Sequence, residues 1–133
     1  VHTAGNEDCH IILRGGKEPN YDKASIDATA AELAKAGLAS LIMVDCSHAN
    51  SRKQHERQLE VAADVAAQVA AGDSRIIGLM IESHLNAGRQ DLVPGKPLAY
   101  GVSITDGCVG WDDTVTVLRS LAAAVRARRL VSE

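Results

Sequence analysis

Three apolar, strand-like runs of this chain each end in a side chain that can take part in chemistry. Arg14 follows the first run, His48 follows the second, and Glu82 ends the third. In parallel α/β proteins the carboxyl ends of the strands meet at one edge of the sheet, and ligands bind there. We therefore expect these residues, distant in the sequence, to converge on one active site.

His48 and Glu82 have the side chains of metal ligands. His48 lies in a polar segment and could simply be hydrogen-bonded at a helix start, but its place after a strand favours a metal ligand or a catalytic base. Glu82 follows a continuous apolar run, where a carboxylate must be paired, metal-bound or protonated because an isolated buried charge is too costly. Asp45 and Asn50 are candidates for orienting His48.

Asp106 is a possible third ligand. In the sequence Ser-Ile-Thr-Asp-Gly it could equally be a turn residue, and the residues alone leave both readings open. If Asp106 reaches the site, then His48, Glu82 and Asp106 offer one nitrogen and two carboxylates. Such a set suits Mn, Fe, Co or Zn.

Arg14 stands before Gly15 and Gly16, and this arrangement favours an anion site. The guanidinium is a planar fork that suits a phosphate or a carboxylate, and glycines let the backbone approach a phosphate closely. A structural alternative is that Arg14 pairs with a neighbouring carboxylate.

The elements that must position these residues alternate between strand and helix. Strands are expected over residues 10–14, 41–46 and 76–82. A first helix is expected over residues 22–36, and a second begins with the capping-box pattern of Ser51 to Gln54 and ends at Gly72. A third, from about 112 to 129, is expected to direct these apolar residues inward: Val115, Leu118, Leu121, Ala122 and Val125.

This order predicts an α/β fold, specifically the last three β/α units of a (β/α)8 TIM barrel. A barrel of about 250 residues allots roughly 31 residues to each unit, close to the spacing between these strands. Residues 1–133 then form a single segment, the C-terminal portion of a TIM-barrel catalytic domain. Three parallel strands alone would leave two bare edges, so we expect the missing strands to come from upstream sequence or from another chain. Residues 83–110 lack periodicity, and loops of that length are usually functional.

Composition excludes several classes of partner. The net charge is -3, which argues against nucleic acid and anionic membranes, and no apolar run approaches the ~20 residues that span a bilayer. Three cysteines without framework spacing indicate a reducing compartment, so we expect a cytoplasmic protein. Cys9 and Cys108 are expected to be buried, packed thiols. The chain begins with Val and has no signal-peptide pattern, which suggests a segment of a longer protein.

The same residues resemble the class I DAHP synthases. The resemblance extends through essentially the whole chain, and four segments carry most of it: Cys9–Tyr21, Asp45–Ser51, Glu82–Leu85 and Tyr100–Asp106. It implies a barrel enzyme that condenses phosphoenolpyruvate with erythrose 4-phosphate to DAHP and phosphate. That reaction is the first step of the shikimate pathway to the aromatic amino acids.

The resemblance also implies roles for individual residues. His48, Glu82 and Asp106 fall where the family has three of its four ligands to a divalent metal ion. Arg14 falls where an arginine grips phosphoenolpyruvate, so Arg14 and His48 are the expected catalytic residues. His48 is further expected at the phosphate of that substrate, and Asp106 at a hydroxyl of the sugar phosphate.

Several parts of the family pattern have no counterpart in residues 1–133. These are the fourth metal ligand (a cysteine near the end of the first barrel strand), a Lys-Pro-Arg-Thr stretch, and the regulatory site for aromatic amino acids. Cys46 could substitute as a ligand, although a packed thiol is the favoured reading. We therefore expect the isolated chain to be inactive, with the N-terminal part of the barrel as its partner, and the protein to form a homo-oligomer.

Two other hypotheses remain open. The protein could be another metal-dependent barrel enzyme, of hydrolase type, in which His48, Glu82 and Asp106 activate water. It could instead be a catalytically inactive piece that binds a divalent ion weakly or self-associates through its open sheet edges.

Overall fold

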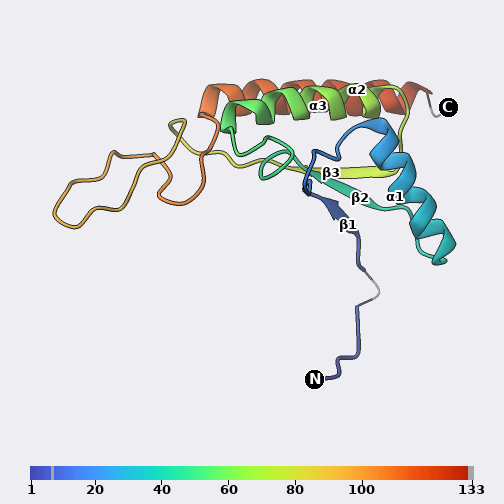
Figure 1. Ribbon diagram of the computed structural model, residues 1–133. Coiled ribbons are helices and arrows are strands. Elements are labelled where there is room, and N and C mark those ends of the chain that lie inside the picture. The colour runs from blue at the N-terminus through green and yellow to red at the C-terminus, as the bar shows by residue number, and fades with distance from the viewer. Residues whose placement is uncertain (7, 132–133) are drawn as a thin grey trace.

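The computed structural model describes residues 1–6 and 8–131 and contains three parallel strands and three α-helices (Figure 1). The strands are β1 (Ile11–Leu13), β2 (Ile42–Asp45) and β3 (Ile76–Met80). The helices are α1 (Lys23–Lys35), α2 (Gln58–Ala70) and α3 (Trp111–Val131), and a short 3₁₀ helix, η1 (His55–Arg57), precedes α2. The predicted alternation of strand and helix is confirmed.

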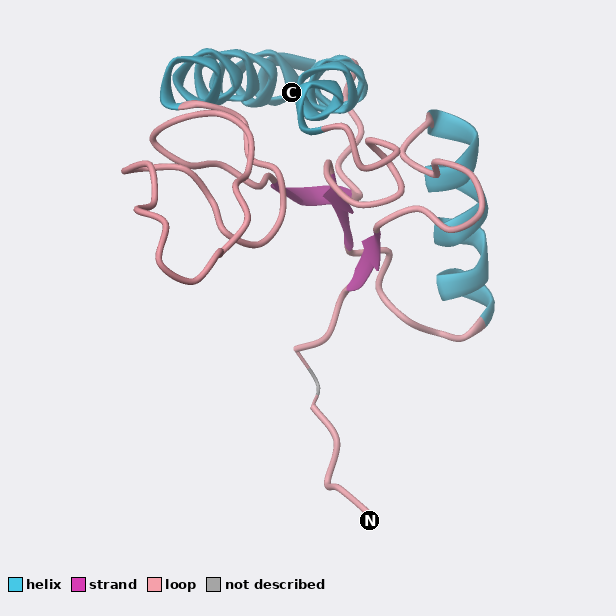
Figure 2. Ribbon diagram, turned by 60° about the vertical axis from the view of Figure 1, so that its left-hand side comes forward, coloured by secondary structure: helices cyan, strands magenta, loops and turns pink. Residues whose placement is uncertain are grey.

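The strands lie side by side in the order β1-β2-β3, and all neighbours are parallel. The three helices lie on one side of the curved sheet (Figure 2). Parallel strands joined by helices on one side are the geometry of consecutive units of a (β/α)8 barrel, so the predicted α/β fold class is confirmed. This arrangement places the carboxyl ends of all three strands at one edge.

The hydrophobic core lies between the sheet and its helices. Ile42 and Val44 of β2 are fully buried there and pack with valines of α2 and with Ile26 of α1. On the opposite face, Ile12 pairs with Met43, and Met43 is in register with Gly78. Ile12 is 51% exposed, so no described residue covers this second face as the helices cover the first.

Local signals define α1 as predicted. Asp22 is the N-cap and its carboxylate accepts a hydrogen bond from the backbone N–H of Ser25. The hydrogen bonds from Ser25 lower the pKa of Asp22, as expected of a capping carboxylate. The helix is followed by Gly37, whose φ of 69° lies in the left-handed region that favours glycine.

The predicted start of the second helix is wrong. Residues 51–53 form a turn in which Arg52 and Lys53 both have positive φ, and α2 begins only at Gln58. The cause is tertiary: the amide of Asn50 bonds to the carbonyls of Leu13 and Asp45, which ties this segment to the ends of β1 and β2. These contacts override the local capping pattern.

The predicted inward face of the last helix is wrong in part. Leu118 is 55% exposed, and the buried residues of α3 are Val117 and Ala124. Val117 and Ala124 each line a cavity together with residues of α2, and α2 runs beside α3 in the same direction (Figure 1). Apolar residues lie on more than one side of α3, and the contact with α2 selects which of them are buried.

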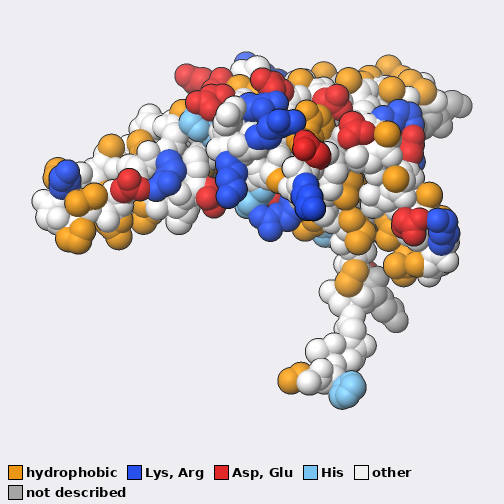
Figure 3. Space-filling view, in the orientation of Figure 1, with side chains coloured by type: hydrophobic (Ala, Val, Ile, Leu, Met, Phe, Trp, Pro, Cys, Tyr) orange, Lys and Arg blue, Asp and Glu red, His pale blue; other side chains and the backbone are white. Residues whose placement is uncertain are grey.

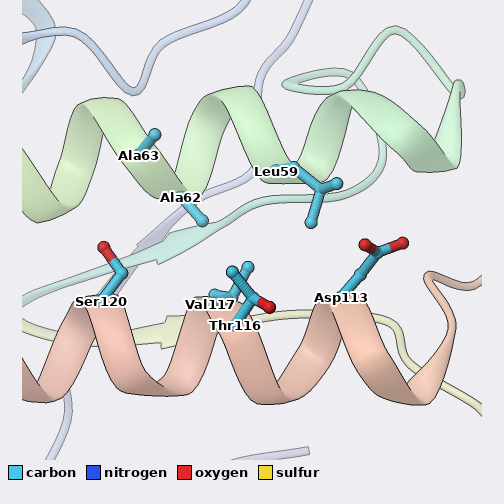
Figure 4. Close-up of a pocket in the computed structure, with 7 residues that line it drawn as sticks. All are labelled: Leu59, Ala62, Ala63, Asp113, Thr116, Val117 and Ser120. Atoms are coloured by element: carbon cyan, nitrogen blue, oxygen red, sulfur yellow. The ribbon is translucent and has the colours of Figure 1, made fainter.

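A cavity of about 180 Å³ opens between α2 and α3 (Figure 4). Leu59 and Ala62 of α2 border it opposite Thr116 and Val117 of α3, and its only ionisable lining residue is Asp113. The strands pass behind both helices in that view. Apart from Asp113 and the hydroxyls of Thr116 and Ser120, the lining of this cavity is apolar.

The long segment from 83 to 110 projects from the body of the molecule (Figure 1). Isolated bridges hold it together, linking Ser83 to Val109, Gly88 to Cys108 and Arg89 to Ser103. Within the described residues, no helix is both long enough and apolar enough to cross a bilayer.

Candidate active site

His48, Glu82 and Asp106 come together at the carboxyl edge of the sheet. One ligand atom from each lies within 4.8 Å of the other two. His48 follows β2, Glu82 lies two residues beyond the end of β3, and Asp106 comes from the segment 83–110. Asp106 therefore does reach the other two residues, which the sequence left open.

A cavity of about 290 Å³ surrounds these three side chains. Its other lining residues are polar, basic or small: Ser47, Ser51, Lys53, His55, Arg89 and Gly107. Lysine and arginine side chains gather on the face where the projecting segment joins the body (Figure 3). Carboxylates and an imidazole at the centre with cations at the rim suit a site for a metal and for anionic substrates.

Asp45 orients the imidazole of His48. One carboxylate oxygen of Asp45 lies 2.7 Å from Nδ1 of His48, and the other accepts the backbone N–H of Ser47 at 2.8 Å. Asp45 is only 3% exposed. Since Nδ1 is occupied, Nε2 is the free ring nitrogen, and it lies 4.0 Å from Oε1 of Glu82. This contact is the one expected of a residue that orients His48.

Asn50 acts on the backbone and not on the imidazole. Its amide donates to the carbonyls of Leu13 and Asp45, and its side-chain oxygen accepts the backbone N–H of Asn20 at 2.8 Å. Asn50 is fully buried and thereby joins the ends of β1 and β2 to the loop after β1. It positions the segment that carries His48 instead of contacting the ring.

Two contacts to Glu82 were not expected from the sequence. The hydroxyl of Ser47 donates to Oε2 of Glu82 at 2.6 Å, and the side-chain amide of Gln58 bonds to the main chain of Glu82. A signal for Gln58 existed: it is a polar residue on the face that Val61 and Val65 bury in α2. Such a residue must find polar partners inside the fold.

Arg14 lies at the same edge of the sheet, directly after β1, but does not line the cavity around His48. Its side chain is exposed. Within residues 1–6 and 8–131, Arg14 makes no ion pair. The alternative, in which Arg14 pairs with a neighbouring carboxylate, is therefore not seen among these residues. The guanidinium is open to a ligand.

The cysteines divide into one exposed and two buried thiols. Cys46 is fully buried in the core, and burial, assisted by the negative charge of Asp45, raises the pKa of its thiol to about 12. A neutral core thiol is a poor metal ligand, so Cys46 is the packed thiol that was favoured. Cys108 is also buried, as predicted. The predicted burial of Cys9 is wrong, because Cys9 precedes β1 in a segment that extends away from the core (Figure 1).

His48 and Glu82 are placed as two ligands of one divalent metal ion would be, and Asp106 lies within 4.8 Å of both. Metal bonds to nitrogen and oxygen are about 2.0–2.2 Å long, so two ligand atoms on one ion stand roughly 3–4 Å apart. The 4.0 Å between Nε2 of His48 and Oε1 of Glu82 is at the upper end of that range. Nδ1 of His48 is bonded to Asp45, and Oε2 of Glu82 is bonded to Ser47. Nε2 of His48 and Oε1 of Glu82 are therefore the atoms left for the ion.

Comparison with known proteins gives a consistent result. The sequence model of the DAHP synthetase I family matches residues 1–119. The Phe-sensitive phospho-2-dehydro-3-deoxyheptonate aldolase of Escherichia coli is 58% identical over 129 residues, which are 97% of this chain and 37% of that protein. The tyrosine-inhibited aldolase of Schizosaccharomyces pombe is 54% identical over 133 residues, covering 96% of this chain and 36% of that protein.

A solved structure shows the same similarity in three dimensions. The phospho-2-dehydro-3-deoxyheptonate aldolase of Francisella tularensis superposes with a TM-score of 0.88 at 48% identity, covering 95% of this chain and 37% of that one. The chain thus spans between one third and two fifths of the length of the relatives it matches.

Proposed function

Because the chain belongs to the DAHP synthetase I family, we propose that residues 1–133 supply one side of the active site of a DAHP synthase. The reaction joins phosphoenolpyruvate to erythrose 4-phosphate and releases phosphate, as the first step of the shikimate pathway. The observation that carries this proposal is the convergence of His48, Glu82 and Asp106 within 4.8 Å.

His48 through Nε2, Glu82 through Oε1 and Asp106 through its carboxylate would hold a divalent metal ion. Bound there, the ion would polarise the aldehyde of erythrose 4-phosphate and stabilise the negative charge that develops on its oxygen. The donor set is compatible with Mn, Fe, Co or Zn and does not select among them.

The protein groups bind and orient the substrates. Arg14, exposed and without an ion-pair partner among the described residues, would bind an anionic group of phosphoenolpyruvate. Asp45 holds the ring of His48, and Asp106 would meet a hydroxyl of the sugar phosphate. The methylene carbon of phosphoenolpyruvate forms the new carbon–carbon bond to the aldehyde carbon, and the aldehyde oxygen takes up a proton to become a hydroxyl. Water supplies that proton and adds its hydroxyl to the carbon that carries the phosphate. The bond from that carbon to the phosphate oxygen then breaks, which leaves a ketone and releases phosphate.

The remaining substrate contacts would come from barrel units outside residues 1–133, which makes those units the main partner of this segment. They would close the barrel by pairing with the free edges of β1 and β3, and their inward side chains would cover the open face at Ile12. A homo-oligomer and a cytoplasmic location are further parts of the proposal. The free thiols of the buried Cys46 and Cys108 are compatible with a reducing compartment.

A chimera tests the proposal. Residues 1–133 replace the matching segment of the Escherichia coli Phe-sensitive relative, and the loss of phosphoenolpyruvate that depends on erythrose 4-phosphate is measured. We expect activity in the chimera, almost none after His48→Ala, and none from residues 1–133 alone. A folded chimera that hydrolyses phosphate esters but forms no carbon–carbon bond would support the hydrolase hypothesis instead.

A further inference from the structure

We infer that Ser47 and Gln58 are positioning residues that hold Glu82 with Oε1 directed at Nε2 of His48. The inference rests on the proposed metal site and assigns a task to two side chains that carry none in the proposal above. Ser47 acts on the carboxylate of Glu82, and Gln58 acts on its main chain.

Glu82 lies where regular structure no longer fixes it. β3 ends at Met80, so the main chain of Glu82 is outside the ladder that joins β2 and β3. A carboxylate on a three-bond side chain, extending from a main chain outside this ladder, would sample several directions unless other groups held it. Something beyond the sheet must therefore define its position.

Gln58 supplies the missing ladder bonds. Its Oε1 accepts the N–H of Glu82 at 2.8 Å, and its Nε2 donates to the carbonyl of Glu82 at 3.1 Å. The N–H of Val109 donates to the same carbonyl at 3.0 Å from the other side. Glu82 is thus held from both sides by groups that lie outside β3.

The burial of Gln58 supports a specific task. Gln58 is 0% exposed, at the first position of α2 and on the same face as Val61 and Val65. An apolar side chain would pack there without needing partners, whereas a buried amide is tolerated only when its donor and acceptor are satisfied. Both of these groups are satisfied by Glu82.

Ser47 fixes the carboxylate itself. Its hydroxyl donates to Oε2 of Glu82 at 2.6 Å, and Ser47 is 6% exposed, so water does not compete freely for this bond. With Oε2 engaged, Oε1 is the oxygen that faces His48. Asp45 holds the ring of His48 through Nδ1 and also accepts the N–H of Ser47. One buried carboxylate therefore helps to position both His48 and the serine that holds Glu82.

The test measures Mn²⁺ affinity by titration calorimetry in the chimera described above, together with the melting temperature of each metal-free variant. Ser47→Ala and Gln58→Met should each weaken Mn²⁺ binding by roughly 10- to 100-fold, the range for groups that orient metal ligands. Ser47→Thr keeps the hydroxyl and should bind Mn²⁺ within about threefold of the parent. If Ser47 had a purely structural role, Ser47→Ala would lower the melting temperature, but Ser47→Ala and Ser47→Thr would not differ in Mn²⁺ affinity.

Two matched controls separate position from chemistry. Ser40→Ala removes a serine hydroxyl at the other end of β2, where it bonds to the carbonyl of Ala30. Gln68→Met makes the Gln58 substitution again on α2, where the amide bonds to the carbonyl of Tyr21. Neither should change Mn²⁺ affinity, although Gln68→Met should lower the melting temperature.

The outcomes are distinguishable. If the parent binds Mn²⁺, His48→Ala does not, and Ser47→Ala and Gln58→Met bind as the parent does, the positioning role is wrong while the metal site stands. If the parent and His48→Ala bind equally, the metal site of the proposed function is wrong and the positioning role fails with it. Loss of affinity in Ser47→Ala and Gln58→Met but not in the matched controls supports the inference.

Discussion

The carboxylate of Asp45 lies 2.7 Å from Nδ1 of His48, and this contact decides which ring nitrogen faces Glu82. Asp45 belongs to the last position of β2, so the sheet itself fixes the carboxylate and, through it, the imidazole. His48 lies in the turn after β2 and has a φ of 49°, a conformation that few residues other than glycine adopt.

Replacing Asp45 by Asn should weaken metal binding in the chimera by roughly 10- to 100-fold, because an amide is a weaker partner for Nδ1–H and can also favour the wrong tautomer. The affinity for Mn²⁺, measured by calorimetry, checks this. Asp27→Asn is a suitable control, since Asp27 pairs with Lys23 and Arg75 on the surface, away from the site. Unchanged Mn²⁺ affinity in Asp45→Asn would show that the contact does not orient His48.

Removing divalent metal should abolish condensation reversibly. Treating the chimera with a chelator and then dialysing it should eliminate phosphoenolpyruvate consumption, and adding back Mn²⁺ or Co²⁺ should restore it. The same addition should not restore His48→Ala or Glu82→Ala. Full activity in protein shown by elemental analysis to lack metal would contradict the proposed role of these ligands.

Much of the site could be predicted because the ends of buried strands can be identified from the sequence. The apolar runs before Arg14, His48 and Glu82 define strands of a parallel sheet, and parallel strands place their carboxyl ends at one edge whatever the details of the loops. Asp106 could not be placed this way, since its segment has no strand or helix of its own beyond isolated bridges. The resemblance to the family supplied that residue.

The features that the sequence missed depend on long-range contacts. Ser51 to Gln54 has the pattern of a helix start, yet the bonds from Asn50 to Leu13 and Asp45 impose a turn. Gln58 is a polar residue on the face of α2 that Val61 and Val65 bury, but only the fold shows that its partners are the backbone groups of Glu82. A local pattern cannot indicate which distant backbone groups lack partners.

The thiols should react with iodoacetamide in an order set by burial. Cys9 is exposed and should be alkylated first. Cys46 should resist at pH 8, because burial raises its pKa from the ordinary 9.0 to about 12 and only the thiolate attacks. Mass spectrometry of peptides from the folded chimera gives the extent at each cysteine. Denaturing the protein before alkylation should make Cys46 react, and rapid reaction of Cys46 in the folded protein would contradict its placement in the core.

Replacing Gly15 by alanine should destabilise the protein more than replacing Gly16. Gly15 has a φ of 78°, and a Cβ placed on it would lie 2.7 Å from Cβ of Ala49, which is closer than side-chain carbons approach. A Cβ on Gly16 meets nothing within 4 Å, and its φ is not positive. Gly15→Ala is therefore expected to lower the free energy of unfolding by about 1–3 kcal/mol, and Gly16→Ala by much less.

Gly15→Ala should also affect function, because the close contact between positions 15 and 49 joins the loop that follows Arg14 to the segment that carries His48. Ala49 sits between His48 and Asn50, so pushing the loop after β1 away from Ala49 moves Arg14 relative to the metal ligand His48. We expect the KM for phosphoenolpyruvate to rise in Gly15→Ala while Mn²⁺ affinity changes little, because Asp45 still holds His48 from β2. Steady-state kinetics on the chimera checks the first and calorimetry the second. Equal kinetics for Gly15→Ala and Gly16→Ala would show that the close approach at Ala49 does not set the position of Arg14.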